Sequence, residues 1–426
     1  MIIWGSIILI IALFLIVIWY LQDGVLFLFN YSRIGCLIWL LGLGLYDLGL
    51  SSLYKPNFII NILSLIVIIN FGIMSKVLPT DIRKIYDSVS QTRDPGKNYK
   101  IAVIFTLGLG VVSFISNYQS GNLRFFLSNT AVKTSISMSY FLNLMVVVSL
   151  FFYYNGRNAN SKRKSWLNYI FSGFALFLIF CNMSRGPLMF WATGVLIFET
   201  CRYVERRKNK YLSVKQILVL VIIALIFVWG FGAIGDFRTH SIFGGGASKY
   251  YHTPADWPSG ITWIYIYLSS PFENARYALS SISVRNYSYF NLLFYPIIKL
   301  LSNIIGMGSK YSQYVEHFDN VYPILKSGYG LNVGSFMLDA YADLNIIGIL
   351  VYICMYDVIA FFIHKLMNSR KTLGISKSIM FPIIIQIAIW SVFSNSVFKI
   401  AGIWVDIFFV LIWDKCSKLK IRLGRA

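Results

Sequence analysis

Charged residues are scarce in this 426-residue chain. They make up 13% of the sequence, whereas hydrophobic residues make up 57%, and the mean hydropathy is +0.66. A water-soluble domain has about a quarter of its residues charged, so this composition excludes an ordinary soluble protein and predicts that most of the chain lies in lipid. Backbone groups in lipid must be paired within helices or a closed barrel. The apolar runs are continuous rather than alternating, so the sequence predicts an all-α fold.

Cysteine is also rare, and none lies in the longest polar segment, so no disulfide framework and no CxxC metal site is expected. A cleavable signal is missing as well, because the first apolar stretch, residues 2–20, lacks a basic leading region and a small-residue cleavage site. The five cysteines fall in or beside apolar runs or in the basic tail: Cys36, Cys181, Cys201, Cys354 and Cys416.

Acidic residues are outnumbered, at 17 against 38 Lys and Arg, which gives a formal net charge of +21. Five short polar segments hold 24 of the 38 basic residues, and each borders an apolar run. This placement is typical of cytoplasmic segments under the positive-inside rule. No aromatic-interleaved basic domain accompanies them, so we expect no nucleic-acid partner. The five segments are residues 78–100, 155–165, 202–216, 364–378 and 413–426.

Apolar segments long enough to cross a bilayer recur along the chain. Counting back from the basic tail places all five basic segments in the cytoplasm and the uncharged N-terminus on the far side. The sequence predicts a polytopic transmembrane helical bundle of about 11 (10–12) spans. Its parts are an N-terminal bundle of about eight spans (1–234), a large far-side loop (235–343), and C-terminal spans with a basic cytoplasmic tail (344–426). The predicted spans are 2–20, 34–53, 58–77, 101–116, 139–154, 166–182, 187–201, 217–234, 344–363, 379–394 and 397–412.

The far-side loop is the outlier among the connections, at 109 residues for 235–343. It is crowded with Tyr, Phe and Trp, which argues against disorder. Its apolar stretches 261–268 and 290–301 are predicted to form short amphipathic or re-entrant helices against the bilayer. The loop holds seven basic residues, seven acidic residues and three of the four histidines. Arginine should be rare on this side, so its arginines predict an anionic partner.

Two clusters of this far side carry arginine. In the turn at 182–187, Arg185 lies at a span boundary, where it could clamp a phosphate or anchor a helix end by snorkelling. The segment 235–240 supplies Asp236, Arg238 and His240, and is followed by PFENAR, which ends in Arg276. The alternative for this second cluster is structural ion pairing, of Asp236 with Arg238 or of Glu273 with Arg276.

A third cluster runs through the glycine-rich segment 327–336 to two carboxylates. Glycine allows a ligand to approach the backbone closely. Asp339 and Asp343 are four residues apart and are expected to share one helix face at the water boundary. The alternative is a hydrated helix start, where carboxylates favour the dipole.

Charged residues in the interior of predicted spans are costly and need a partner, and the sequence has such residues at Asp47, Asp357, Lys399 and Asp406. Lys399 and Asp406 are seven residues apart, which favours a structural pair. The sequence leaves open whether Asp47 and Asp357 face water or the bundle interior.

The motifs, in their order, resemble the bacterial oligosaccharide repeat-unit polymerases, the Wzy-type O-antigen polymerases. The resemblance rests on SRG at 184–186, GDFR-H at 235–240, PFENAR at 271–276 and GYGLNVGSFMLDAYADLNIIG at 328–348. It covers residues 160–365 by motif and the whole chain by topology.

What this resemblance implies is metal-independent glycosyl transfer at the periplasmic face of the bacterial inner membrane. The donor would be the growing glycan on undecaprenyl pyrophosphate, and the acceptor a hydroxyl of a newly flipped, lipid-linked repeat unit. Besides these glycans and the lipid bilayer, a chain-length regulator protein is an expected partner, and no cofactor is expected. The large loop would be periplasmic and the C-terminus cytoplasmic.

The resemblance also assigns candidate residues, because guanidinium grips phosphate oxygens bidentately and an acceptor hydroxyl needs a base. An Arg-x10-Gly pattern of some polymerases is absent here, since none of the four candidate arginines has Gly at that spacing. The candidate pyrophosphate or glycan binders are Arg185, Arg238 and Arg276, with Arg285 a weaker fourth. The candidate bases are Asp236, His240, Asp339 and Asp343, and the candidate sugar contacts are Tyr329, Asn332 and Tyr341.

Three other classes compete with this interpretation. An O-antigen ligase shares the large loop but carries a His-rich motif near the loop's end, and His317 stands apart from such a motif. A flippase or transporter of lipid-linked sugars predicts charges through the spans and helices broken at mid-membrane. A membrane acyltransferase usually places a histidine inside a span, whereas His364 lies at a cytoplasmic boundary.

Overall fold

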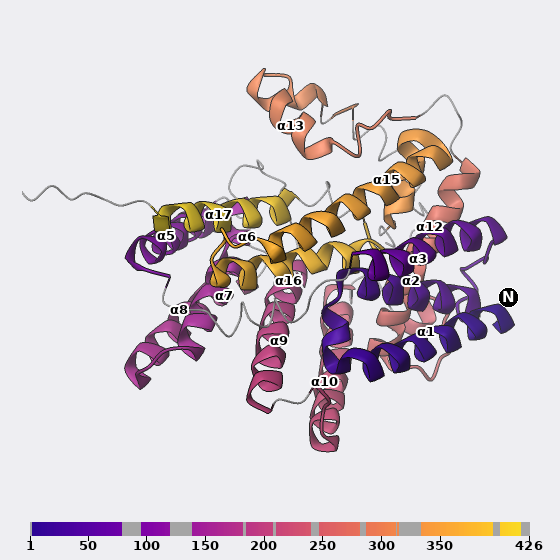
Figure 1. The fold of residues 1–426 in the computed structure, drawn as a ribbon. Helices are drawn as coiled ribbons and strands as arrows, with labels where there is room; N and C mark the ends of the chain where they lie inside the picture. The colour runs from indigo at the N-terminus through magenta and orange to yellow at the C-terminus, as the bar shows by residue number, and fades with distance from the viewer. Residues whose placement is uncertain are drawn as a thin grey trace, which may run out of the picture. The chain divides into compact units, whose positions relative to one another are not determined.

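In the computed structural model of the protein, every regular element of the described residues is a helix, which confirms the all-α class (Figure 1). Five helical segments are long and apolar enough to cross a membrane: Ile2–Phe29, Phe58–Val77, Lys97–Gln119, Lys162–Cys181 and Phe336–Asn368. The other predicted spans coincide with helices that are shorter, less apolar or partly outside the described residues, so the count of eleven stays a prediction. The described residues are 2–78, 95–119, 139–181, 185–207, 210–239, 247–281, 287–311, 313–314, 334–394 and 401–418.

The chain divides into two compact units, each assembled from segments far apart in the sequence. Unit 1 consists of Met1–Pro79, Lys210–Phe361 and Ile387–Ile400. Its helices are α1 (Ile2–Asp23), the short 3-10 helix η1 (Gly24–Phe29), α2 (Tyr31–Leu48), α3 (Phe58–Val77), α10 (Val214–Thr239), α11 (Ala247–Tyr250), α12 (Ser259–Ser281), α13 (Tyr295–Ile304) and most of α15 (Phe336–Asn368).

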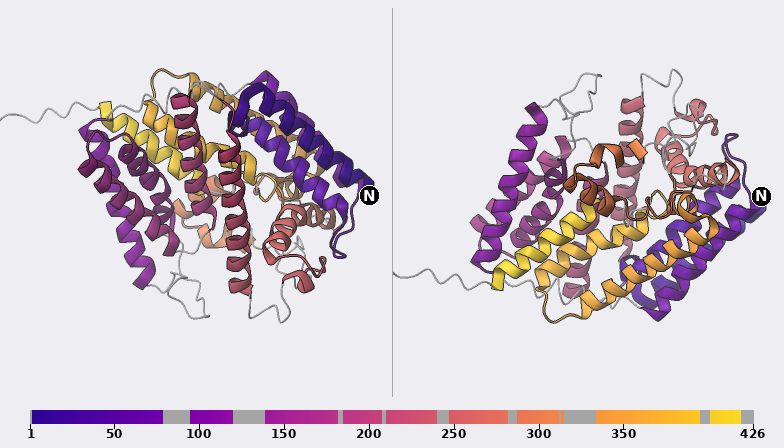
Figure 2. Two further views of the ribbon diagram at one scale, coloured as in Figure 1. Left: turned by 90° about the horizontal axis from the view of Figure 1, so that it is seen from below. Right: turned by 90° about the horizontal axis from the view of Figure 1, so that it is seen from above.

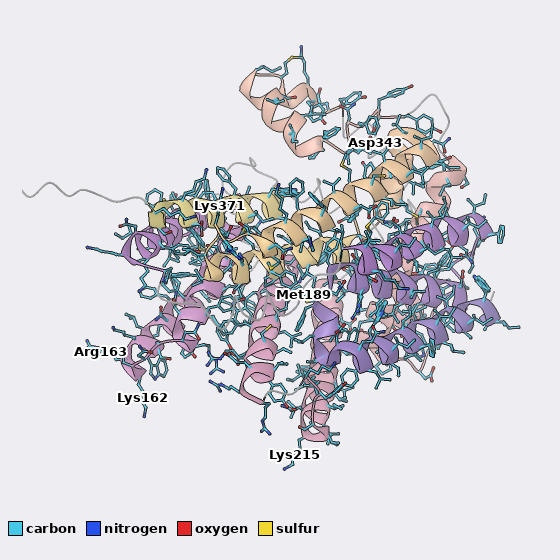
Figure 3. All side chains as sticks on the ribbon, in the orientation of Figure 1. Lys162, Arg163, Met189, Lys215, Asp343 and Lys371 are labelled. Atoms are coloured by element: carbon cyan, nitrogen blue, oxygen red, sulfur yellow. The ribbon has the colours of Figure 1, made fainter. Side chains whose placement is uncertain are left out.

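Unit 2 consists of Thr80–Asn209, Phe362–Gln386 and Ala401–Ala426. Its helices are α5 (Lys97–Gln119), α6 (Ser139–Asn143), α7 (Met145–Arg157), α8 (Lys162–Cys181), α9 (Arg185–Arg207), most of α16 (Gly374–Trp390) and α17 (Ala401–Lys418). The basic start of α8 is solvent-exposed, and Figure 3 shows Lys162 and Arg163 at that end of the helix.

In unit 1, α1, α2 and α3 lie side by side, as Figures 1 and 2 show. Their outward faces carry large apolar side chains that suit lipid, such as Phe14 (63% exposed) and Phe58 (70% exposed). The crossing of α1 over α2 is close because it uses glycine. A Cβ atom on Gly5 would lie 2.7 Å from the Leu48 amide nitrogen and 2.8 Å from the Gly44 carbonyl oxygen.

Helix α2 ends earlier than the sequence predicts. The predicted span ran to residue 53, but the helix ends at Leu48 because Gly49 adopts the left-handed conformation (φ 60°) typical of a C-cap. Residues 49–57 therefore form a longer turn before α3. This turn carries polar groups that the site uses.

The predicted far-side loop contains two helices at the stretches where the sequence predicts short ones. Helix α12 is longer than predicted, and α13 is short as predicted. The stretch 261–268 belongs to α12, a helix of 23 residues that contains Pro271 and packs against α2 and α10. The stretch 290–301 contributes to α13, a helix of 10 residues. The prediction of short helices is therefore wrong for the first stretch, because packing against two neighbours carries α12 past its proline.

Helix α15 is broken where the sequence predicts the start of a span, at residue 344. Leu344 and Asn345 leave the helical conformation, and Asn345 has a φ of 60°. The short helix before the break folds onto the longer one after it, with Phe336 stacked on Tyr352 at 6.3 Å between ring centroids. Gly348 permits this, because a Cβ there would collide with the Ala340 carbonyl.

Polar contacts in unit 1 join turns that the topology places on the same side. On the predicted far side, the Ser51 hydroxyl donates to the Tyr251 carbonyl (2.6 Å) and the Lys55 amide donates to Glu273 (3.1 Å). On the predicted cytoplasmic side, the Val25 amide donates to the Lys210 carbonyl (3.0 Å). These contacts agree with the predicted alternation of sides within this unit.

Unit 2 has the same internal agreement. Basic segments that are predicted to be cytoplasmic form hydrogen bonds in pairs. The Arg202 guanidinium donates to the Arg157 carbonyl (2.9 Å), and the Lys418 ammonium donates to the Lys371 carbonyl (2.7 Å). The Leu373 amide also donates to Asp414 (2.8 Å). In unit 2 these contacts join segments that are predicted to lie on one side; the topology itself stays a prediction.

Candidate functional site

The best-organised polar cluster on the predicted far side of unit 1 is built around Glu273. This α12 carboxylate is only 2% exposed, and both of its oxygens accept hydrogen bonds. Oε2 accepts from the Tyr46 hydroxyl (3.0 Å) and the Lys55 amide (3.1 Å). Oε1 accepts from Nε (2.9 Å) and Nη2 (2.5 Å) of Arg276. We call Tyr46, Lys55, Glu273 and Arg276 the Glu273 cluster.

Arg276 is held one helical turn after Glu273, and its side chain is 22% exposed. The ion pair that the sequence left as an alternative is therefore present. Nε and Nη2 bond to Glu273, and Nη1 makes no hydrogen bond within the described part of the chain. The hydrogen bond to Glu273 raises the pKa of Arg276, so the guanidinium stays charged. It can direct its remaining N–H groups to an anion while Glu273 fixes its plane.

The turn between α2 and α3 adds further groups that sequence analysis did not assign to the site. Lys55 is exposed, so a second positively charged side chain stands on a residue whose backbone amide binds Glu273. Nδ1 of His252 lies 3.0 Å from the Ser52 hydroxyl. Ser52 and Lys55 are three positions apart in the sequence, so their Cα atoms are at most about 10 Å apart. His252 and the Glu273 cluster therefore belong to the same local surface.

His252 has a backbone conformation that non-glycine residues rarely adopt, with φ of 52°. Such residues are enriched at functional sites, where the surrounding structure holds them. The imidazole is exposed, and a histidine side chain of this kind can serve as a proton acceptor in general acid–base chemistry.

Asp236, predicted as a base, lies near the end of α10 and binds α12. Its Oδ1 accepts from the Ser259 hydroxyl (2.6 Å) and from Nε1 of Trp263 (3.0 Å). These bonds fix the start of α12 against α10, while Oδ2 makes no bond to another described residue. Asp236 therefore keeps one oxygen that could take a proton.

Asp343, also predicted as a base, is fully buried at the end of the short helix that begins α15 (Figure 3). It accepts from the Ser288 hydroxyl, the Tyr352 hydroxyl (2.6 Å) and the amides of Leu292 (3.1 Å) and Leu293 (2.9 Å). The consecutive amides form a nest, which suits an anion. Because every lone-pair direction is used by a donor, this environment favours a structural role for Asp343.

The neighbours of Asp343 are also buried rather than at a water boundary. Asp339 is 6% exposed and Tyr341 is 9% exposed. The Tyr341 ring meets Tyr287 edge-on, with 6.4 Å between centroids. The expectation that Asp339 and Asp343 face water is therefore not met, because residues 287–293 cover this helix.

The remaining candidates lie wholly or partly outside the described residues. His240, Arg285, Tyr329 and Asn332 lie outside the described residues, as do Lys399 and His317. The backbones of Arg185, at the start of α9, and of Arg238, in the last turn of α10, are described, but the structure describes neither side chain. Their roles stay predictions. Of the predicted site residues with described side chains, Arg276 belongs to the Glu273 cluster, and Asp236 lies on α10, which packs against α12.

The comparisons with known proteins leave the family open: the chain matches no family model, no curated protein and no solved structure. Among the described residues there is no group of three or more His, Cys, Asp or Glu that could hold a metal ion. The local chemistry is therefore that of a guanidinium fixed by a carboxylate, with an exposed lysine on the neighbouring turn and an imidazole that contacts that turn. Such an arrangement can bind an anion and accept a proton.

Proposed function

We propose that this protein is a membrane glycosyltransferase that polymerises undecaprenyl-pyrophosphate-linked oligosaccharide repeat units at the periplasmic face of the bacterial inner membrane. The observation that carries the proposal is the Glu273 cluster, which presents Arg276 and Lys55 on a side where positive charge is normally scarce. The order of motifs that resembles the repeat-unit polymerases supports it.

Charge arithmetic favours an anionic ligand at this cluster. Glu273 neutralises one of the two cations, so the cluster keeps about one positive charge when Lys55 is protonated. Guanidinium and ammonium groups suit phosphate oxygens, and pyrophosphate becomes a good leaving group once its charge is met. Arg238 and Arg185 are proposed to add to this charge.

In the proposed reaction, the acceptor hydroxyl oxygen attacks the anomeric carbon of the growing glycan. The bond between that carbon and the pyrophosphate oxygen breaks, and undecaprenyl pyrophosphate leaves with the electron pair. The hydroxyl proton passes to a base within hydrogen-bond reach. His240 stays a candidate base from the sequence; Asp236 is less favoured because it binds α12 at Trp263, about three helical turns before Glu273, and Asp339 and Asp343 are less favoured because they are buried.

A break in a helix at mid-membrane would favour a transporter instead. Here the break at Leu344 and Asn345 coincides with the predicted boundary of a span. The charged side chains that we assign to the reaction, such as Lys55 and Arg276, also belong to segments predicted to lie on the far side of the membrane. Both observations favour surface chemistry, in a polymerase or a ligase, over transport.

The test is the polysaccharide that remains after the gene is deleted in its source strain and restored from a plasmid. We expect deletion to leave single repeat units on the surface lipid, with the long-chain ladder restored by the plasmid. Loss of every unit, including the single one, would contradict the proposal and indicate a flippase or a ligase. Ladders unchanged by deletion would exclude a role in this polymerisation.

A further inference from the structure

A second polar cluster lies within the predicted membrane-spanning part of α2 and α3. Nδ2 of Asn61, on α3, donates to Oδ2 of Asp47, on α2, at 2.8 Å. The two side chains are 3% and 0% exposed. The close crossing of α1 covers this place, because a Cβ on Gly5 would lie 2.9 Å from the Asp47 carbonyl carbon.

Three oxygens of this cluster are buried and accept no hydrogen bond from the described residues. They are Oδ1 of Asp47, Oδ1 of Asn61 and Oγ of Ser64. Ser64 follows Asn61 by three positions and is 0% exposed, so it shares the helix face that meets Asp47. A buried carboxylate with only one neutral donor is strongly disfavoured in lipid unless a positive charge joins it.

We propose that Asp47, Asn61 and Ser64 bind a sodium ion. All three unpartnered atoms are hard oxygen donors, which suit hard cations rather than zinc or copper. The cluster has a single carboxylate, which balances one monovalent charge. Calcium takes six to eight oxygens and often several carboxylates, so it fits this set poorly.

The proposed site is linked to the Glu273 cluster through two consecutive residues of α2. Asp47 follows Tyr46, whose hydroxyl donates to Glu273 and lies 3.0 Å from the Lys55 carbonyl. An ion that joins α2 to α3 would steady the turn that carries Lys55. The sodium site does not depend on the proposed glycosyl transfer, and its test uses no sugar substrate.

The chain supplies a matched control, a second pair in which an asparagine amide donates to an aspartate carboxylate. Asn70 of α3 donates to Asp357 of α15 at 2.7 Å, again an amide to a carboxylate inside predicted spans. Both residues are half-buried, and neither has an oxygen that is both buried and without a partner. This second pair should therefore need no ion.

The experiment is thermal unfolding of the purified full chain in detergent while NaCl replaces choline chloride at constant ionic strength and pH. We expect a saturable rise in Tm, of about 3 °C at ten times the dissociation constant. Asp47→Asn should abolish the rise, Ser64→Ala should shift it to higher sodium concentration, and Asp357→Asn should retain it. KCl in place of NaCl should give a smaller rise.

A direct measurement does not depend on how well the variants fold. Equilibrium binding of radioactive sodium to the wild-type protein should reach one ion per chain. No saturable binding, or a sodium response that survives Asp47→Asn, would overturn the proposal. A Tm that responds to pH and not to sodium would also overturn it, since the partner of Asp47 would then be a proton.

Discussion

Two arginine–glutamate pairs, one in each unit, differ in what surrounds them. In unit 1, Arg276 binds Glu273 at 2.5 Å, and Glu273 is 2% exposed. In unit 2, Arg157 binds Glu199 at 2.6 Å, and both side chains are 33% exposed. The pairs have similar lengths, so length alone does not distinguish them.

The two pairs distribute their hydrogen bonds in opposite ways. Arg157 grips both oxygens of Glu199 with Nε and Nη2, each at 2.6 Å, in the bidentate geometry of a closed pair. Arg276 directs both donors to one oxygen, and the other oxygen binds Tyr46 and the Lys55 amide. Glu273 thus ties a second positively charged residue to the pair, which suits ligand binding, whereas the unit 2 pair suits a structural role.

The largest difference should come from removing the arginines. Arg276→Ala should reduce long-chain polysaccharide synthesis by about 100-fold or more, because a charged donor to the leaving group is lost. Arg157→Ala should leave synthesis per folded protein within about twofold. The measurement is the polysaccharide ladder on a gel, normalised to membrane-inserted protein. Equal ladders from the two variants would remove Arg276 from the proposed site.

The glutamates should differ in stability. Glu273→Gln should cost about 3 kcal/mol or more, because a buried charge network loses its anion and Arg276 is left with a neutral partner. Glu199→Gln should cost about 1 kcal/mol or less, since this exposed pair is screened by solvent. Thermal unfolding of both variants in one detergent measures the contrast. A larger loss for Glu199→Gln would reverse our ranking of the two pairs.

Lys55 tests whether the extra charge of unit 1 acts on a ligand. Lys55→Ala should lower polymer synthesis by about tenfold, equivalent to about 1.4 kcal/mol, with little change in Tm because only the exposed side chain is removed. Lys55→Arg should retain most of the synthesis. Lys210→Ala, which changes a lysine in the predicted cytoplasmic turn, is the control and should leave synthesis unchanged. An effect of Lys55→Ala on Tm alone would indicate a structural role.

The smallest expected difference between the two pairs is in stability, after removal of the tyrosine hydroxyl that donates to each glutamate. The Tyr46 hydroxyl donates to buried Glu273, and the Tyr153 hydroxyl donates to half-exposed Glu199 at 3.0 Å. Tyr46→Phe should cost about 1.5 kcal/mol, since a buried carboxylate loses a donor, and Tyr153→Phe about 0.5 kcal/mol. Denaturant or thermal unfolding would resolve this difference. Equal losses would mean that the two glutamates are equally hydrated.

The sequence could predict the helices because hydropathy is a local property. It predicted the start of the late span at 344, where α15 breaks, but it carried α2 past Gly49, whose conformation it could not supply. Helix α12 runs beyond its predicted end because its packing against α2 and α10 outweighs the proline. Hydropathy does not report such contacts.

The site was predicted in part for the same reason. Glu273 and Arg276 are three residues apart, so their pairing could be weighed from sequence as an alternative. Tyr46 and Lys55 join them across 227 and 218 residues, and no local pattern marks either one. Asp343 was predicted to lie at a water boundary, but it is buried, because residues 287–293 fold over it. The sequence around an aspartate does not show whether its carboxylate oxygens already accept hydrogen bonds from other parts of the protein.

The bond between the Lys55 amide and Glu273 also sets an order of events during synthesis. The ribosome must add 218 residues after Lys55 before its partner exists. At about 5 to 20 residues per second this takes about 10 to 40 s. During that interval the turn between α2 and α3 lacks this partner, so an early part of the chain is completed only once α12 has been made.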